Sequence, residues 1–278
     1  MMKPSLILCA AIVLVLAGCS SGGSAKPTPH SITTGDGTVW DLVWSDEFEG
    51  EGLPDSEKWS YEVGSIRNNE LQYYTESRVE NARMEGGYLV IESRKEDYEG
   101  AQYSSASLTT DNRASWTYGR IEVSAKLPVG VGMWPAIWML GVNIDDVGWP
   151  TCGEIDIMEN VGYERGSIHG TVHTEAYNHV KGTAKGGSLY RQSAHDEFHL
   201  YAIEWFEDRI DFYVDDVKYF SFANDGKGDN ATWPFDKPHY LILNAAIGGS
   251  WGGQYGVDDE IFPAQYLIDY VRVYKLRK

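Results

Sequence analysis

Cysteine is scarce in this sequence, since the 278 residues contain only 3. Cys9 and Cys19 lie in an N-terminal segment that we expect to be processed during export, so Cys152 alone remains for the folded protein. A lone cysteine excludes an intrachain disulfide. Cys152 precedes a strongly acidic stretch, but no histidine is paired with it in the sequence, so we expect a buried structural thiol.

Basic residues are also few. Lys and Arg together number 23 against 41 Asp and Glu, which gives a formal net charge of -18. Such a charge argues against nucleic acid or an anionic membrane surface as the partner, because both repel an acidic protein. It fits a neutral substrate better than a polyanionic one.

Long hydrophobic runs are lacking as well. The clearest run, residues 6–17, follows Lys3 and is too short to span a bilayer, so it has the form of a signal peptide. It ends in Leu-Ala-Gly-Cys, which resembles a bacterial lipobox, with residues 1–18 removed and Cys19 lipidated. An ordinary cleaved signal with an incidental cysteine is the alternative.

The lipobox resemblance implies an exported bacterial lipoprotein anchored to the membrane through Cys19. Ser20 follows in place of Asp, which in such proteins indicates the outer membrane or the cell surface. Residues 19–36 are rich in Ser, Gly, Pro and Thr and lack apolar periodicity, so we expect a flexible tether there.

Residues 37–278 show no internal repeat, no second linker and no convincing amphipathic helix, so we expect one domain. Instead, short segments of alternating or apolar character predict strands. These segments are residues 39–44, 88–94, 118–127, 132–140, 166–174, 198–206, 209–222, 239–247 and 266–276. Many short strands without helices predict an all-β antiparallel sandwich.

The stretch Gly-Glu-Ile-Asp-Ile-Met-Glu-Asn at residues 153–160 carries the most chemistry. On a strand, Glu154 and Asp156 share a face, whereas plain alternation puts Glu159 on the opposite one. One extra residue, a β-bulge, would return Glu159 to the shared face, and bulges are frequent beside active sites. With their Cα atoms roughly 13 Å apart and their side chains leaning inward, the two glutamates would bring their carboxylates to about 5 Å, as in retaining glycosidases.

The alternative is that these three acids form a solvated face of an antiparallel sheet. The apolar residues Ile155, Ile157 and Met158 between them weaken that reading, because they bury the other face of the strand. Aromatic segments on both sides of the stretch weaken it further.

Two histidines, His169 and His173, invite a zinc site, since on a helix residues four apart converge on one ion. Gly170, Thr171 and Val172 between them favour a strand, where the two rings lie roughly 13 Å apart, too far for one metal. We therefore exclude zinc here. His173 faces either the carboxylates, the core or the surface.

Aromatic residues make up 13% of the chain, with 10 Trp and 18 Tyr. Their flat amphipathic rings suit sugars as well as protein cores. Trp134 and Trp138 flank Pro135 in an apolar strand, which leaves one of them able to line a cleft. Trp251 stands in a run of glycines, and so we expect an exposed stacking platform there.

The run EIDIME, with WPAIWML before it and HGTVH after it, resembles glycoside hydrolase family 16. It is most similar to the laminarinase branch, whose motif carries the extra bulge residue. The segments NNELQYYT, SWTYGRIE and YVRVY extend the resemblance over nearly everything after the tether. The resemblance implies an antiparallel β-jelly-roll sandwich with a concave substrate cleft, and hydrolysis with retention of configuration.

The resemblance also implies roles for single residues. Glu154 matches the nucleophile, Glu159 the acid/base, and Asp156 the acid that tunes the nucleophile. Further positions match residues that contact sugar, namely Trp134, Trp138, His173 and, more weakly, Asn69.

Many family members hold a structural calcium ion, and the counterparts of its ligands here are Glu47, Gly87 and Asp269. No cofactor is implied for catalysis. The chain departs from the family pattern at one position, since Ser107 stands where many relatives have an arginine that contacts a sugar subsite.

The sequence therefore predicts a retaining endo-β-1,3-glucanase acting by double displacement on laminarin-type polysaccharide, as a monomer. One alternative keeps the enzyme and changes the substrate to mixed-linkage glucan, xyloglucan or a marine galactan such as agarose, carrageenan or porphyran. Another is a non-catalytic glycan-binding lipoprotein on the same fold, although such a protein has no need of all three acids.

Overall fold

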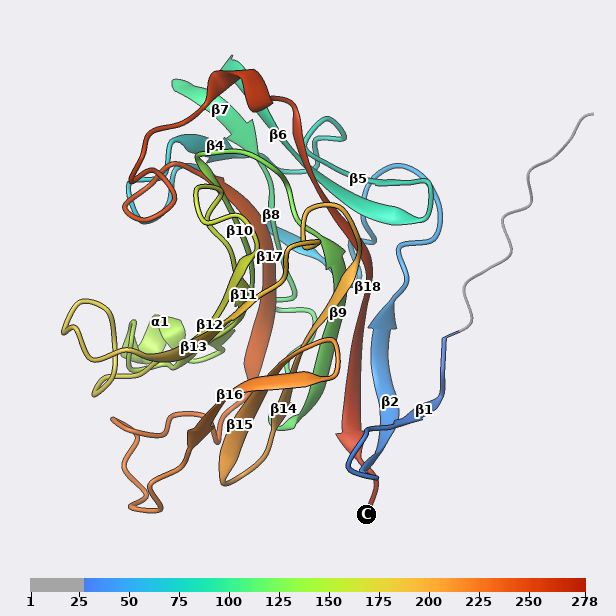
Figure 1. The fold of residues 1–278 in the computed structure, drawn as a ribbon, viewed down its shortest axis with the longest axis vertical. Helices are drawn as coiled ribbons and strands as arrows, with labels where there is room; N and C mark the ends of the chain where they lie inside the picture. Colours follow the sequence, from blue (N-terminus) through green and yellow to red (C-terminus); the bar gives the residue numbers. More distant parts are fainter. Residues whose placement is uncertain (1–27) are drawn as a thin grey trace, which may run out of the picture.

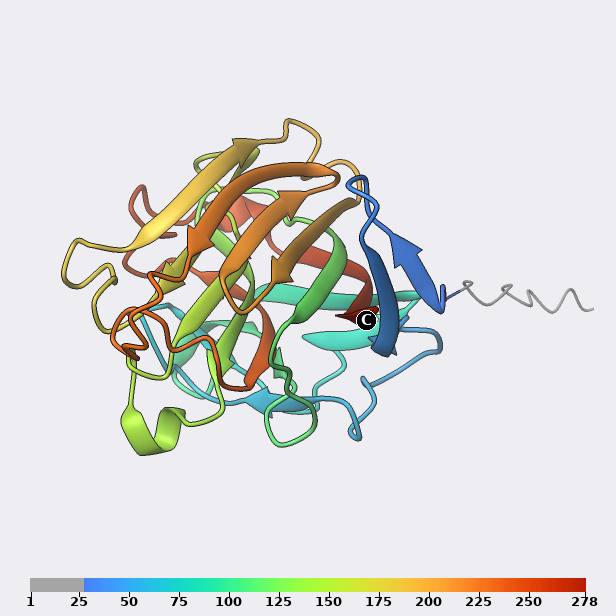
Figure 2. The same ribbon diagram turned by 90° about the horizontal axis from the view of Figure 1, so that it is seen from below.

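The computed structural model describes residues 28–278, which form two β-sheets packed face to face (Figures 1 and 2). Eleven strands form one sheet: β1 (Ser31–Thr33), β2 (Val39–Asp46), β4 (Gln72–Tyr74), β5 (Ala82–Glu85), β6 (Tyr88–Tyr98), β7 (Ala101–Ser105), β9 (Gly119–Lys126), β14 (His199–Trp205), β15 (Arg209–Val214), β16 (Val217–Ala223) and β18 (Ala264–Leu276). Its strands are antiparallel apart from the parallel pair β4 and β7.

The second sheet has seven strands in the order β13-β12-β11-β10-β17-β8-β3. Their bounds are β3 (Ser60–Glu62), β8 (Ser107–Thr109), β10 (Met133–Gly141), β11 (Glu154–Glu159), β12 (Ser167–His173), β13 (Lys185–Tyr190) and β17 (His239–Ile247). The only helical pieces among the described residues are α1 (Ile144–Val147) and the 3-10 turn η1 (Asp259–Ile261). The all-β sandwich predicted from the sequence is confirmed.

One hydrophobic core fills the space between the sheets. Strand β9 shows how the sequence builds it, because its alternate residues Ile121, Val123 and Ala125 are fully buried in that core. The opposite face of β9 is also covered. There Arg120 is 4% exposed and pairs with Glu122 at 2.6 Å and with Glu204 at 2.8 Å.

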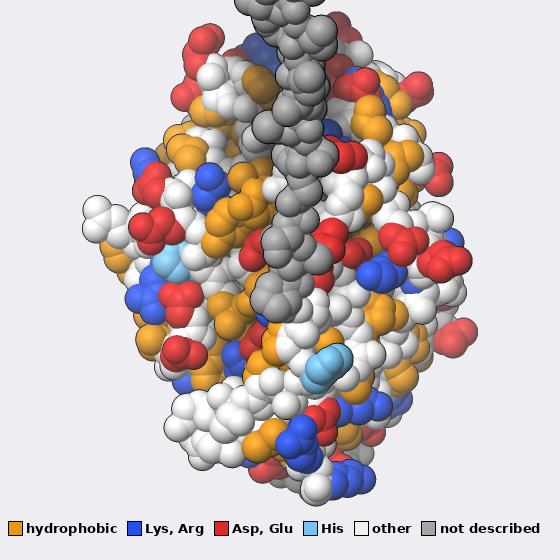
Figure 3. Space-filling model, turned by 90° about the vertical axis from the view of Figure 1, so that its right-hand side faces the viewer, with side chains coloured by type: hydrophobic (Ala, Val, Ile, Leu, Met, Phe, Trp, Pro, Cys, Tyr) orange, Lys and Arg blue, Asp and Glu red, His pale blue; other side chains and the backbone are white. Residues whose placement is uncertain are grey.

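The outer side of the eleven-stranded sheet carries charges of both signs. Figure 3 shows Asp and Glu side chains interspersed with Lys and Arg on this side of the molecule, with no single acidic field. Ion pairs account for part of this mixing, as between Glu47 and Arg272 at 2.8 Å.

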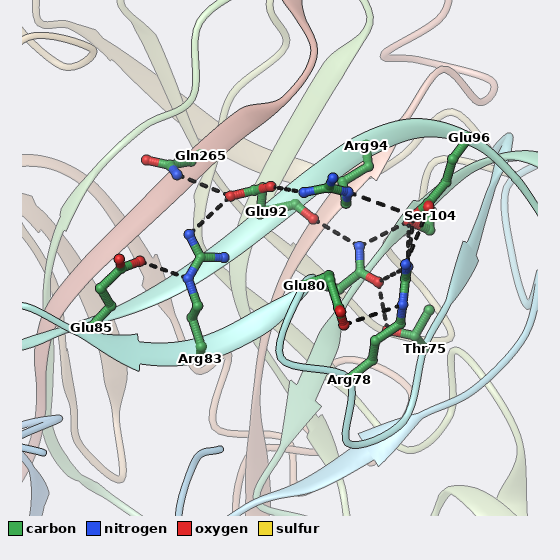
Figure 4. Close-up of polar contacts among 11 residues, drawn as sticks. Thr75, Arg78, Glu80, Arg83, Glu85, Glu92, Arg94, Glu96, Ser104 and Gln265 are labelled. Atoms are coloured by element: carbon green, nitrogen blue, oxygen red, sulfur yellow. Dashed lines mark hydrogen bonds and ion pairs between the residues drawn. The ribbon is translucent and has the colours of Figure 1, made fainter. Parts of the chain in front are cut away.

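A dense polar network joins β5, β6, β7 and β18 to the loop before β5 (Figure 4). Its centre is Glu92, which is 4% exposed and accepts hydrogen bonds from Arg83 at 3.0 Å, Gln265 at 3.0 Å and Arg94. Nearby, Arg78 donates to Glu96 at 2.6 Å. The network ties four strands together around the buried Glu92, whose desolvation is compensated by its paired arginines.

The folded part begins earlier than the sequence predicts. The expected tether ends at residue 36, but Ser31–Thr33 pairs with Val39–Asp41 as a hairpin. The turn is closed by Asp36, whose Oδ1 accepts hydrogen bonds from Thr34 Oγ1 at 2.8 Å and Thr38 N–H at 3.0 Å. The tether prediction is therefore wrong for these residues.

The carboxyl end of the chain returns to the same place. The N–H of Arg277 donates to the carbonyl of Val39 at 2.9 Å, and its guanidinium pairs with Asp41. Both ends of the described chain thus lie at β2, in the eleven-stranded sheet (Figures 1 and 2). Among residues 28–278, no helix combines the length and apolar character that a bilayer-spanning segment needs.

Candidate active site

Strand β11 carries the bulge that the acidic motif predicts. Its partner β12 pairs His173 with Glu154, Thr171 with Asp156 and His169 with Glu159, with a register shift between the last two. Ile157 and Met158 therefore face a single residue of β12. Because directly opposed residues point to the same side of a sheet, all three acids project from one face. That face lies away from the core, which holds Ile155, Ile157 and Met158.

His173 lies between two of the acids. Its Nε2 is 3.6 Å from Glu154 Oε1 and 3.3 Å from Asp156 Oδ2. Ligand atoms of Glu154, Asp156 and His173 all lie within 4.8 Å of one another, so these three side chains have the composition to hold a metal ion. His169 serves other neighbours, since it contacts Glu164 at 3.2 Å and the ring of Trp251 at 5.1 Å.

Each of the two glutamates accepts an indole N–H. Trp134 Nε1 donates to Glu159 Oε1 at 2.9 Å, and Trp149 Nε1 donates to Glu154 Oε2 at 2.8 Å. Trp134 is itself partly exposed and packs edge-on against Trp251, with ring centroids 5.6 Å apart. Two of the three tryptophans predicted to contact sugar therefore stand beside the acid/base candidate.

Burial sets the protonation of these carboxyls. It raises the pKa of Glu159 to about 7, an effect that the Trp134 hydrogen bond opposes and the charge of Glu154 reinforces. Burial together with the charge of Glu159 raises the pKa of Asp156 well above its usual value. Both groups therefore hold a proton more tightly than an ordinary carboxyl group does.

Glu154 has a different environment. Burial and the charge of Asp156 raise its pKa to about 8, above that of Glu159, while His173, the Trp149 N–H and Arg67 act to lower it. When Asp156 holds a proton its charge vanishes, and the stabilising contacts to the Glu154 carboxylate remain. A retaining glycosidase needs an ionised Glu154 facing a protonated Glu159, and the contacts of Glu154 with His173, Trp149 and Arg67 are the ones that favour its carboxylate form.

Comparison with known proteins agrees with this geometry. Residues 68–272 match the family model described as glycosyl hydrolases family 16. The chain belongs to glycoside hydrolase family 16. A beta-glucanase from Rhodothermus marinus is 53% identical over 274 residues, covering 95% of this chain and 93% of that protein.

Solved structures of family 16 enzymes are equally similar. The laminarinase from Rhodothermus marinus superposes with a TM-score of 0.84 at 54% identity, covering 86% of this chain and 98% of that one. A non-specific endo-β-1,3(4)-glucanase superposes with a TM-score of 0.82 at 52% identity, covering 86% and 92%. The fold is therefore the family 16 jelly roll.

Trp138 departs from the role that the family resemblance implies. It is only 8% exposed, because the guanidinium of Arg67 covers its ring at 4.7 Å from the centroid. Below the ring, Trp138 Nε1 donates to Asn244 Oδ1 at 2.7 Å, and Asn244 Nδ2 donates to the Tyr74 hydroxyl at 2.9 Å. Trp138 therefore lies beneath Arg67 on the acid-bearing face of the sheet, and the Arg67 guanidinium is the group exposed there.

Asn69 lies on an exposed loop beside the glycine-rich loop that carries Trp251. The two loops are joined by a hydrogen bond from Ser250 N–H to the Asn68 carbonyl at 2.8 Å. Asn69 lines a shallow hollow there together with Gly248. The structure therefore brings this weaker sugar-contact candidate to the side of Trp134 and Trp251.

Sequence reasoning missed Trp149 and Arg67. Both come from loops, between β10 and β11 and between β3 and β4, and neither has a motif of its own. The one available signal for Trp149 was its position five residues before Glu154, within the loop that leads directly into the acidic strand.

The predicted calcium residues lie on the eleven-stranded sheet. The charges of Asp269 and Glu47 both act on the hydroxyl of Tyr270, and Gly87 has a left-handed φ of 82° in the turn before β6. However, the Glu47 carboxylate accepts two hydrogen bonds from Arg272, at 3.0 and 2.8 Å. The Glu47 carboxylate is therefore engaged by an arginine in this structure.

Two cysteine predictions have different outcomes. Cys152 is fully buried, and burial raises the pKa of its thiol to about 11, so the prediction of a buried thiol is confirmed. The proposed lipidation site, Cys19, and the signal peptide lie outside the described residues.

Proposed function

We propose that this protein is a retaining endo-β-1,3-glucanase in which Glu154 is the nucleophile and Glu159 the acid/base. The observation that supports it best is the bulge in β11, which places both glutamates on one face, each beside an indole N–H donor. Two similar proteins from Rhodothermus marinus are named as a beta-glucanase and a laminarinase.

In the first step, the Glu154 carboxylate attacks the anomeric carbon of a glucose unit while Glu159 donates its proton to the leaving oxygen. The products are a covalent glycosyl-enzyme and a shortened glucan. In the second step, Glu159 removes a proton from water, the water attacks the anomeric carbon, and Glu154 leaves. Asp156 is protonated beside Glu154, so no second negative charge lies next to the nucleophile.

Hydrolysis of laminarin by the wild type, Glu154→Ala and Glu159→Ala tests this assignment. We expect each variant to lose on the order of 10⁴-fold in kcat. Azide should restore cleavage with both variants. In Glu154→Ala it takes the place of the nucleophile and gives an α-glucosyl azide, whereas in Glu159→Ala it attacks the glycosyl-enzyme from the opposite face and gives a β-glucosyl azide. Equal activity in wild type and Glu154→Ala would sink the assignment, and glycan binding without new reducing ends would favour the non-catalytic alternative.

Mixed-linkage glucan is the second substrate that we propose, because a similar structure is described as a non-specific endo-β-1,3(4)-glucanase. Product analysis on laminarin, mixed-linkage glucan and agarose distinguishes the possibilities. We expect release from the first two polysaccharides and none from agarose.

We further propose that the protein is a monomeric lipoprotein anchored by Cys19 at the outer membrane or cell surface. The lipobox-like sequence supports the anchor, and a single strand supplying both glutamates supports activity without a partner copy. Metabolic labelling with a fatty acid should mark the wild type and not Cys19→Ala, and light scattering should give the mass of one chain.

We also propose a structural calcium ion held by Asp269 and by main-chain oxygens of Gly87 and Glu47. Oxygen donors of this kind are the ligands that calcium prefers. Calcium should raise the Tm of the wild type relative to a chelator, and Asp269→Asn should abolish that difference. An unchanged Tm in the wild type would refute the site.

A further inference from the structure

Ser107 begins strand β8, at the position where the family resemblance leads us to expect an arginine. Its side chain is buried, and its Oγ donates to Oε2 of Glu62 at 2.5 Å. The same Oε2 atom also accepts a hydrogen bond from Nη2 of Arg67. A guanidinium therefore does lie beside Ser107, but it is delivered by the loop between β3 and β4.

We propose that Arg67 is a substrate-binding residue that donates hydrogen bonds to hydroxyls of the glucose unit lying against Glu154. In this role it replaces, from a different element, the arginine that β8 lacks at Ser107. The inference rests on the proposed glucanase function and adds a sugar contact to that site.

The first argument is position. Arg67 lies over the ring of Trp138, on the open face of β10, in the same sheet and on the same side as the acids of β11. Trp138 pairs with Asp156 across the two strands, so the covered ring is next to the catalytic row. A sugar that reaches this part of the face meets the guanidinium before it meets the indole.

The second argument is unused donors. A guanidinium has five N–H groups in a rigid fork, and among the residues that the structure describes the only acceptor for Arg67 is Glu62. The Nε atom is buried without any hydrogen-bond partner. The side chain is 20% exposed, so part of the fork remains accessible. Neighbouring hydroxyls of a glucose ring offer the paired acceptors that such a fork fits.

The third argument is charge. Burial alone would lower the pKa of Arg67, but the charges of Glu62, Tyr74, Glu70 and Glu154 outweigh it, so the guanidinium stays cationic. In return, Arg67 lowers the pKa of Glu154. The two side chains are thus close enough for the charge of one to act on the other.

The test compares the wild type with Arg67→Ala, Ser107→Arg and the double variant, using laminarihexaose as substrate. We expect Arg67→Ala to raise KM by roughly tenfold to hundredfold, the loss typical of a hydrogen bond from a charged donor. Its acid limb of kcat/KM should also move to higher pH. The double variant should recover much of the loss, because its new guanidinium starts beside the same Glu62 carboxylate.

Arg277→Ala is the matched control, since Arg277 pairs with Asp41 on the eleven-stranded sheet. Its kinetics should equal those of the wild type, and Tm values show that every variant is folded. Unchanged kinetics in a folded Arg67→Ala would overturn the proposal, as would a lower KM, which would mean that Arg67 obstructs the site.

Calorimetric binding of laminarihexaose separates this inference from the proposed function. If the wild type releases no reducing ends from laminarin, the function fails, yet weaker binding by Arg67→Ala than by wild type would still support the sugar contact. If the wild type is active and both proteins bind equally, only the role of Arg67 fails.

Discussion

The indole N–H of Trp149 donates to Oε2 of Glu154 at 2.8 Å. Trp134 makes the corresponding bond to Glu159 at 2.9 Å. Each proposed catalytic carboxyl thus accepts one hydrogen bond from a tryptophan, although the two tryptophans come from a loop and a strand. Each bond stabilises the ionised carboxylate, so removing it raises the pKa of its own glutamate.

Trp149→Phe should shift the acid limb of the kcat/KM profile to higher pH by several tenths to about one unit. Glu154 must be ionised to attack, and its pKa rises when the N–H is lost. The alkaline limb should stay in place, because Glu159 keeps its bond from Trp134. A profile whose acid limb does not move would show that Trp149 is not bonded to the nucleophile in the active enzyme.

Trp134→Phe should have the complementary effect. Glu159 must be protonated to act as the acid, and its pKa, about 7 in the wild type, rises when the Trp134 N–H is removed. The alkaline limb should therefore move upward by a similar amount, so that the variant keeps more of its activity above pH 7. A downward movement of that limb would contradict the bond.

Glu92→Gln should destabilise the protein at pH 7 by about 2–3 kcal/mol, measured by chemical denaturation. Burial raises the pKa of Glu92, but Gln265, Arg83 and Arg94 together lower it below its ordinary value. The stability that the carboxylate contributes is therefore present above about pH 4.5 and is lost as the pH falls through its lower folded-state pKa.

The difference between wild type and Glu92→Gln should accordingly shrink in acid. Glu85→Gln is the control, since Glu85 also pairs with Arg83 but its side chain is 57% exposed. Its effect should remain within about 0.5 kcal/mol. A penalty for Glu92→Gln that does not depend on pH would assign its role to packing rather than to charge.

Asn244→Ala should cost about 2–4 kcal/mol of unfolding free energy, because it leaves the buried indole N–H of Trp138 without an acceptor and opens a small cavity. The same variant should weaken laminarin hydrolysis, since Trp138 supports Arg67. Asn230→Ala, at an exposed loop position, should change neither property. Full stability in Asn244→Ala would show that the Trp138 bond is dispensable.

The arrangement of the acidic strand was predictable because side chains on a strand alternate between its two faces. Three acids with that spacing share one face only with one extra residue, and the register between β11 and β12 contains it. The same period of two holds in β9, where the alternate residues Ile121 and Val123 enter the core. Local pattern thus determined which residues lie together on a strand.

Contacts between elements far apart in the sequence were not predictable in this way. Arg67 reaches Trp138 because β8 and β3 extend the sheet beyond β17, and no local pattern reports that strand order. For the same reason the sequence left open which of Trp134 and Trp138 lines the cleft, and the ring of Trp138 proves to be covered by Arg67. The early hairpin strand Ser31–Thr33 was missed because three residues are too few to show periodicity.

Both ends of the described chain meet at β2, on the sheet opposite the one that carries the three acids. Arg277 fastens the carboxyl end to the strand that the amino end has just entered, and this seam belongs to the sheet that does not carry the acids. If the protein is anchored through Cys19 as proposed, the anchor joins the described domain on the sheet opposite the acids. A long glucan can then lie across the acid-bearing face and be cut internally.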